Sequence, residues 1–146
     1  MKLGGTIDLT AGDHPETGVA AAVATLLDQG IDPHLITMSS DAFGSQPRFD
    51  ALGHCIGLTY VSPAVLHIEL SGMVKHFGIP LETALLLLTE NPARMLKLQG
   101  IKGCIDINAD ADLIVYDASL AIDRVYAKGK LAVEHGEAIL KGRFEA

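Results

Sequence analysis

The spacing of apolar residues changes once along the chain and predicts two regions. In the first region, residues 3–10 and 34–40 are short apolar runs typical of strands, and residues 16–30 between them have a helical period near 3.6. Gly30 follows that periodic segment, where helices commonly end. A strand, a helix and a strand in succession favour a βαβ unit with a parallel sheet.

Three helices are predicted after this unit. Residues 80–90 are apolar nearly all round, so we expect that helix to be deeply buried. Asn91 and Pro92 have the residue types preferred at an N-cap and at the first helical position, so a short third helix is expected to start there. The first of the three, over residues 63–78, has an apolar stripe formed by Leu66, Leu70, Val74 and Phe77.

From Gly100 onward the apolar period falls to about two residues, which is the period of strands. Short strands are therefore predicted at residues 103–107, 112–117, 122–130, 131–136 and 137–142. The chain divides into an α/β region, residues 1–98, and a small β region, residues 99–146. Two parallel strands cannot form a sheet covered on both faces, and the β region is a set of edge strands. Both regions therefore resemble pieces of a larger structure.

Composition narrows the possible functions. The chain is 49% hydrophobic and 20% charged, which is typical of a globular protein, and its formal net charge is −7. An acidic balance argues against binding to nucleic acids or to anionic membranes, and no apolar stretch is long enough to span a bilayer. Cys55 and Cys104 do not form a disulfide framework, so we expect buried thiols and a cytoplasmic protein.

Asp41 is the strongest candidate for chemistry. It follows the second predicted strand, and enzymes with parallel sheets place their sites at the carboxyl ends of strands. The competing interpretation is a turn or capping aspartate. Ser45 follows Gly44 in a turn, where its hydroxyl either holds a substrate carboxylate or serves only the turn.

Metal sites have weaker support from the residues themselves. The six histidines show no HxH, HExxH or HxxxH spacing, although His14 lies in the loop after the first strand, on the same side as Asp41. Asp110 and Asp112 lack EF-hand spacing, so a turn is favoured over a calcium site.

The segment 89–117, "TENPARMLKLQGIKGCIDINADADLIVYD", resembles the C-terminal signature of the amidohydrolase superfamily. These proteins are metal-dependent (β/α)8-barrel hydrolases with a small β-sandwich-like domain. Asn108 stands where glycine is common in that signature, and asparagine tolerates the left-handed conformation that such a turn needs. The other signature positions match at Gly103, Ile105, Asp110, Ala111, Asp112 and Leu113.

Within that superfamily, "GGTIDLT" and "SSDAFGSQPRFD" resemble the isoaspartyl (β-aspartyl) dipeptidases. The resemblance implies an α/β fold: the C-terminal part of a metal-dependent (β/α)8 (TIM) barrel, contributing its last two strands, followed by a small β-domain. A whole barrel takes roughly 250 residues, so this chain is expected to be a C-terminal portion, or fragment. The resemblance assigns Asp41 as a metal ligand and proton shuttle and Ser45 as a substrate-binding residue.

The implied reaction is hydrolysis of β-aspartyl dipeptides by metal-activated water, with zinc as the cofactor and most of its ligands outside this chain. We expect the isolated chain to be inactive, and to form a homo-oligomer or to need a preceding barrel segment. Two alternatives stay open: a cyclic amidohydrolase of the hydantoinase or dihydropyrimidinase kind, and a non-catalytic remnant that serves as an interaction module.

Overall fold

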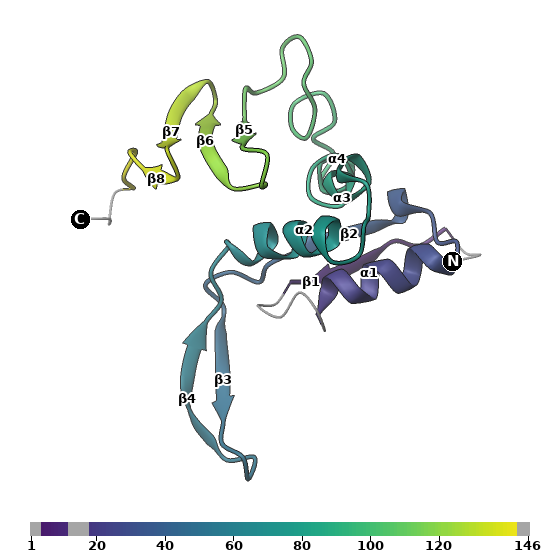
Figure 1. Ribbon diagram of the computed structural model, residues 1–146, viewed down its shortest axis with the longest axis vertical. Coiled ribbons are helices and arrows are strands. Elements are labelled where there is room, and N and C mark those ends of the chain that lie inside the picture. The colour runs from purple at the N-terminus through teal and green to yellow at the C-terminus, as the bar shows by residue number, and fades with distance from the viewer. Residues whose placement is uncertain (1–3, 12–17, 143–146) are drawn as a thin grey trace.

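A computed structural model describes residues 4–11 and 18–142 of the chain (Figure 1). The predicted βαβ unit is confirmed. β1 (Ile7–Thr10) pairs in parallel with β2 (Ile36–Ser39), and α1 (Val19–Asp28) connects them. Gly30 follows the C-cap of α1 with φ +77°, a left-handed conformation that glycine adopts without a Cβ clash.

A β-hairpin follows β2 and was not predicted from the sequence. β3 (Ser45–Phe49) pairs antiparallel with β4 (Cys55–Tyr60), and Figure 1 shows the two strands projecting away from the helices. Asp50 closes the hairpin turn, because its carboxylate accepts the backbone N–H groups of Leu52 at 2.9 Å and His54 at 2.8 Å. Pro47 and Gly57 weaken the strand pattern, which explains why the alternation was missed.

The helices after the hairpin are α2 (Val65–Lys75), α3 (Leu81–Leu86) and α4 (Glu90–Met95). The expectation that the α3 segment is deeply buried was wrong. Within α3 only Ala84 is buried, and the leucines around it are partly exposed. α3 packs against α2, α4 and the 3₁₀ turn η1 (Pro33–Leu35), so its opposite side faces solvent in the described part of the chain.

The predicted start of the last helix was also wrong. Thr89 is the N-cap of α4, and Asn91 lies inside the helix with a fully buried side chain. Its amide is used elsewhere, because Nδ2 donates to the carbonyl oxygens of Pro33 at 2.8 Å and Ile36 at 2.7 Å. Buried carbonyl groups need a donor, and this requirement outweighs capping at Asn91.

The hydrophobic core lies between β2 and the helices. Ile36 and Met38 of β2 pack there against buried residues of α1, α2 and the α3 segment. Glu69 of α2 is also fully buried, and its carboxylate accepts the N–H groups of Val19 at 3.3 Å and Ala20 at 2.7 Å. A carboxylate from one helix thus satisfies the first amides of another, where side-chain acceptors and negative charge are favoured.

The C-terminal region forms one antiparallel sheet in the order β5-β6-β7-β8. Its strands are β5 (Leu113–Tyr116), β6 (Ile122–Ala127), β7 (Lys130–Glu134) and β8 (Glu137–Ala138). Residues 103–107 were predicted as a strand but form turns and irregular chain.

Asn108 has φ +71°, so its expected left-handed conformation is confirmed. The described residues form three separate small sheets, so a closed barrel, a two-sheet sandwich and the boundary at Leu98 stay predictions.

Both cysteines are free and exposed, which corrects the expectation that they are buried. Cys55 lies on the projecting hairpin and Cys104 lies in the turn that replaces the predicted strand. In the described ranges, no helix is both long and apolar enough to cross a membrane.

Candidate active site

The β1–β2 sheet presents a polar face opposite its core face. Asp8 on β1 lies beside Thr37 on β2, and its carboxylate accepts hydrogen bonds from the hydroxyls of Thr37 at 2.7 Å and Ser39 at 2.6 Å. The backbone N–H of Ala11 donates to the Ser39 carbonyl at 2.6 Å. These bonds fix the carboxyl end of β2 against β1.

Asp41 begins a tight turn immediately after this strand end. Its carbonyl oxygen accepts the N–H of Gly44 at 3.2 Å, and the Ser40 hydroxyl oxygen accepts the N–H of Ala42 at 3.2 Å. Asp41 and Phe43 have φ values of +47° and +62°. Left-handed conformations are costly for residues other than glycine and concentrate at functional sites. The turn therefore holds the Asp41 side chain at the rim of the strand ends.

Asp41 approaches Gly44 so closely that position 44 has little room for a side chain. A Cβ at Gly44 would lie 3.1 Å from the Asp41 carbonyl oxygen and 3.1 Å from Oδ1 of its carboxylate. Any larger residue would push against the carboxylate or against the turn. The glycine in "DAFGS" thus keeps the carboxylate close to the backbone of the turn.

Ser45 is the first residue of β3 and pairs with Tyr60. It is exposed, as is Asp41, and one turn separates the two residues. The two predicted site residues therefore lie at the start and just after the end of this turn. Within residues 4–11 and 18–142, the Asp41 carboxylate accepts no hydrogen bond.

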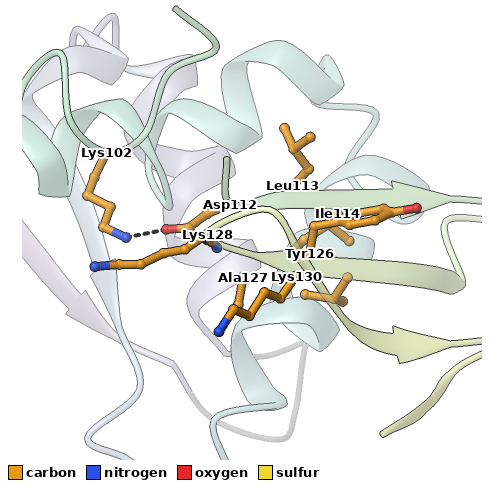
Figure 2. A pocket seen from close by; sticks show the side chains of 9 residues that line it. Lys102, Asp112, Leu113, Ile114, Tyr126, Ala127, Lys128 and Lys130 are labelled. Carbon is orange, nitrogen blue, oxygen red and sulfur yellow. Dashed lines mark hydrogen bonds and ion pairs between the residues drawn. The ribbon is translucent and has the colours of Figure 1, made fainter. Parts of the chain in front are cut away.

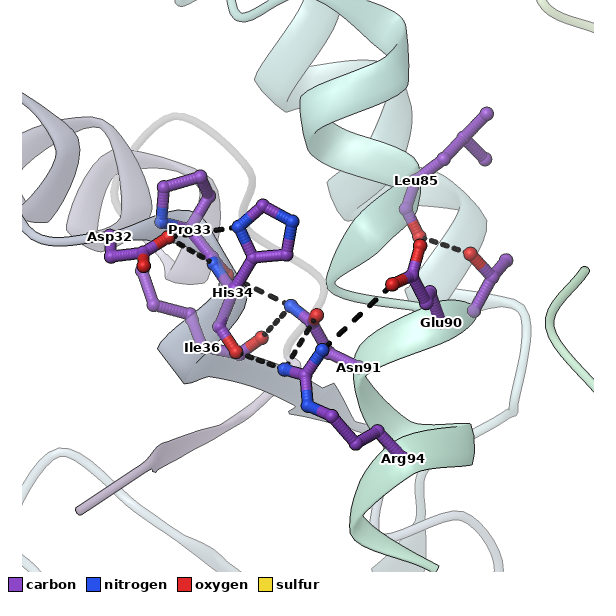
Figure 3. A network of polar contacts seen from close by, with 9 residues as sticks. Asp32, Pro33, His34, Ile36, Leu85, Glu90, Asn91 and Arg94 are labelled. Atoms are coloured by element: carbon purple, nitrogen blue, oxygen red, sulfur yellow. Dashed lines mark hydrogen bonds and ion pairs between the residues drawn. The ribbon is translucent and has the colours of Figure 1, made fainter. Parts of the chain in front are cut away.

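Sequence reasoning missed two groups that support this rim. Asp8 had a usable signal, since it alternates with apolar neighbours in "TIDLT" and so lies on the polar face of a strand. Asn91 had none, because its partners are backbone carbonyls far away in the sequence. Figure 3 shows Asn91 and Arg94 of α4 reaching the chain at the start of β2.

Arg94 donates to the His34 carbonyl oxygen and to the Asn91 side-chain oxygen, the latter at 3.0 Å. Together with the two bonds from Asn91, these contacts tie the entry to β2 to α4. The strand that leads to Asp41 is therefore held at both ends, by α4 at its start and by β1 at its carboxyl end.

The described residues do not fit a complete metal site. They contain no group of three or more His, Cys, Asp or Glu side chains placed to hold an ion. His14 lies outside the described residues. Asp41 is a carboxylate at the right end of the sheet, but further ligands for a metal would have to come from beyond this part of the chain.

Asp110 and Asp112 instead bind a lysine. Lys102 contacts both carboxylates, at 2.8 Å for Asp110, and Figure 2 shows its bond to Asp112. The Lys102 ammonium donates hydrogen bonds to both carboxylates, which holds the pKa of both carboxyls below the usual value and raises the pKa of Lys102. A concavity of about 700 Å³ lies beside this cluster on the β-sheet, and neither Asp41 nor Ser45 lines it.

The chain belongs to the amidohydrolase family, whose model matches residues 11–132. It is similar to a solved β-aspartyl dipeptidase from Fervidobacterium islandicum AW-1, crystallised with a β-Asp-Leu dipeptide. The two are 36% identical with a TM-score of 0.80, over 99% of this chain and 37% of the other.

The curated relatives have a different name. The chain is 39% identical over 69 residues to the N-acetylglucosamine-6-phosphate deacetylase of Mus musculus. The matched segment covers 44% of this chain and 17% of that enzyme. A solved deacetylase of the same name from Mycobacterium smegmatis is 25% identical with a TM-score of 0.63, over 88% of this chain and 38% of its own. The chain thus spans well under half of each of these relatives.

Proposed function

We propose that this chain supplies the proton-transferring carboxylate and a substrate-binding serine of a β-aspartyl dipeptidase. One observation carries the proposal: Asp41 is exposed on a constrained turn at the carboxyl end of β2, in a chain that aligns over 99% of its length with a solved β-aspartyl dipeptidase. Carboxyl ends of parallel strands are where barrel enzymes place their chemistry.

Asp41 would transfer a proton in both steps of the amide hydrolysis. It accepts a proton from the attacking water as the new C–O bond forms, and it returns that proton to the leaving nitrogen as the C–N bond breaks. A bound metal ion would supply activation of the water at neutral pH. Because the described residues contain no complete ligand set, zinc stays a prediction and its other ligands are assigned to no residue here.

Ser45 is proposed to bind a carboxylate of the dipeptide. Its hydroxyl is exposed at the start of β3, one turn from Asp41, so a substrate that meets Asp41 can also reach it. A hydroxyl donates a hydrogen bond to a carboxylate oxygen, and a bond to a charged partner is worth about 1.5–3 kcal/mol.

Deacetylation of an N-acetylated sugar phosphate is the second candidate, because the curated relatives have that name. Both reactions hydrolyse an amide, so Asp41 would have the same role and only the substrate contacts would differ. Hydrolysis of a cyclic amide and a non-catalytic interaction role stay predictions.

The decisive experiment uses a chimera in which this chain replaces the matching C-terminal portion of the Fervidobacterium dipeptidase. We expect the chimera to cleave β-Asp-Leu. Asp41→Asn should lower kcat at least about 100-fold, the usual contribution of a general acid or base. Ser45→Ala should raise KM by roughly 10-fold or more, as expected for a lost hydrogen bond to a charged group.

Asp50→Asn is the matched control, because Asp50 closes the hairpin turn and has no assigned role in the chemistry. Deacetylation of N-acetylglucosamine 6-phosphate without dipeptide cleavage would favour the second candidate. Full activity of Asp41→Asn would refute the role of Asp41. The 146-residue chain alone should cleave neither substrate with added zinc, and cleavage by it would contradict the need for outside ligands.

A further inference from the structure

The β3–β4 hairpin is amphipathic, and its apolar face is uncovered. Leu58 and Tyr60 lie two residues apart on β4 and so share one face, and Ile56 precedes them at a shift in the strand register. The register places Pro47 of β3 opposite Leu58 on that face. The other face is polar or small, with Arg48 opposite Gly57 and with Thr59 further along β4.

The apolar side chains of the hairpin are largely exposed to solvent. Exposed fractions are 58% for Ile56, 69% for Leu58 and 66% for Tyr60. Phe49 and Leu52 extend the apolar surface toward the tip, with 59% and 82% exposed. An isolated two-stranded hairpin is marginally stable in water, and a large exposed apolar patch marks an interaction site. We define these five residues as the hairpin face.

The position of Pro47 restricts how a partner can bind. Proline has no N–H to donate. Within a sheet it is found on edge strands, where its nitrogen points away from the neighbouring strand. A further strand therefore cannot pair continuously along the outer edge of β3. A partner is therefore expected to pack on the hairpin face and not along the edge of β3.

Charge favours a second copy of the chain as that partner. The chain as a whole has a formal net charge of −7, so most of its surface repels another copy. Residues 45–60 contain one cationic and one acidic side chain, Arg48 and Asp50, and are therefore neutral when His54 is neutral. Two copies can meet through their hairpins without bringing like charges together.

The available area is also sufficient. An aromatic side chain buries about 150–250 Å², so the hairpin face with Phe43, which stacks on Tyr60 at its base, offers on the order of 800 Å². A stable interface buries about 800 Å² per partner. A symmetric dimer requires a self-complementary patch, and an apolar face of one hairpin packed on the same face of another meets that requirement.

We propose that the hairpin face is the dimer interface of this protein, with two hairpins packed face to face about a two-fold axis. The face borders the proposed site, because Phe43 belongs to the turn that holds Asp41 and Ser45 lies opposite Tyr60. The test of the dimer does not depend on the catalytic role of Asp41.

The test is the mass of the purified chain by sedimentation equilibrium from about 1 to 100 µM, a range that brackets micromolar affinity. We expect a dimer that dissociates on dilution. Leu58→Lys on the hairpin face should weaken dimerisation at least 100-fold. Thr59→Lys adds the same charge to the opposite face of the same strand and should leave the dimer intact. Unchanged far-ultraviolet circular dichroism would show that the helices remain folded in both variants.

A second measurement avoids any loss of hairpin structure in Leu58→Lys. With Cys55→Ser, Cys104→Ser and Thr59→Cys, a spin label at position 59, on the opposite face of β4, reports the distance between two hairpins by pulsed electron resonance. A single narrow distance supports the proposal. A chain that stays monomeric overturns it, as does a dimer equally weakened by both lysine variants or a dimer with no coupling between labels. Growth into larger aggregates would also overturn it, because a two-fold interface closes at two copies.

Discussion

The two ends of the molecule are stabilised in different ways. Every buried apolar side chain in the described residues lies between Ala11 and Ala93, where β2 and the helices enclose a core. From residue 94 to residue 142 no described side chain is buried. Leu113, Ile114 and Val115 of β5 are all at least 38% exposed. The C-terminal sheet is therefore held mainly by strand pairing and by polar turn contacts.

The regions also meet through few contacts. The ring of Tyr116 stacks on His67 of α2 at 5.5 Å, and burial raises the pKa of Tyr116. Gly103 packs so closely on α4 that a Cβ there would lie 2.5 Å from the Thr89 carbonyl oxygen. The comparison shows that the α/β region contains the only core in the described part of the chain, while the apolar side chains of β5 in the β region are exposed.

The largest expected effect is loss of core packing. Leu87→Ala removes a fully buried side chain and should cost about 2–5 kcal/mol of the free energy of unfolding, from lost burial and the resulting cavity. Leu140→Ala makes the same chemical change in the C-terminal region, where the side chain is 50% exposed, and should cost under about 1 kcal/mol.

Urea unfolding followed by circular dichroism measures both values. Equal losses of unfolding free energy for the two leucines would contradict the comparison, because they would show that Leu140 is packed as tightly as Leu87. A change in the m-value of Leu87→Ala, with little change in the midpoint, would instead indicate loss of two-state unfolding.

The next effect concerns a buried polar group. Asn91→Ala removes the side-chain donor from the Ile36 carbonyl oxygen and leaves the Pro33 oxygen with the Ile36 N–H, and the loss of a buried hydrogen-bond partner costs about 1–3 kcal/mol. Hydrogen exchange should show that Asn91→Ala accelerates opening at β2 more than it accelerates opening at β6. Asn108→Ala is the control at an exposed asparagine, and it should leave exchange at β2 unchanged. Equal protection of β2 in wild type and Asn91→Ala would contradict the anchoring role.

Local pattern was sufficient for part of the fold. The βαβ unit follows from two apolar runs and a periodic segment ending at Gly30, all of which are short-range signals. The position of Asp41 followed from the end of β2. The superfamily signature correctly indicated the family and the left-handed Asn108, whereas the two-residue apolar period wrongly predicted a strand at residues 103–107.

The missed features depend on contacts distant in sequence. The role of Asn91 depends on carbonyl groups more than 50 residues earlier, and Glu69 caps a helix 49 residues away. Exposure of Cys55 depends on a hairpin that leaves the body of the molecule. Composition predicts that thiols are buried on average, but only the topology shows that this one lies on a projecting strand.

The smallest effect is expected from the exposed ion cluster of the C-terminal region. Lys102 lowers the pKa of Asp110 and Asp112 below 3.8, so these carboxylates favour the fold above that pH, and their contribution is lost as pH falls through the lowered values. The raised pKa of Lys102 gives a contribution that is complete below pH 10.5 and is lost as pH rises through the raised value.

Lys102→Met should therefore return both carboxyl pKa values toward 3.8, measured by carbon-13 NMR of the side-chain carboxyls. Lys130→Met removes the same charge from β7 and should leave both values low. Because the three groups are at least partly exposed and screened by water, the midpoint of urea unfolding at pH 7 should change less than in Asn91→Ala. A larger change would show that the β region depends on this cluster as strongly as the α/β region depends on its buried polar contacts.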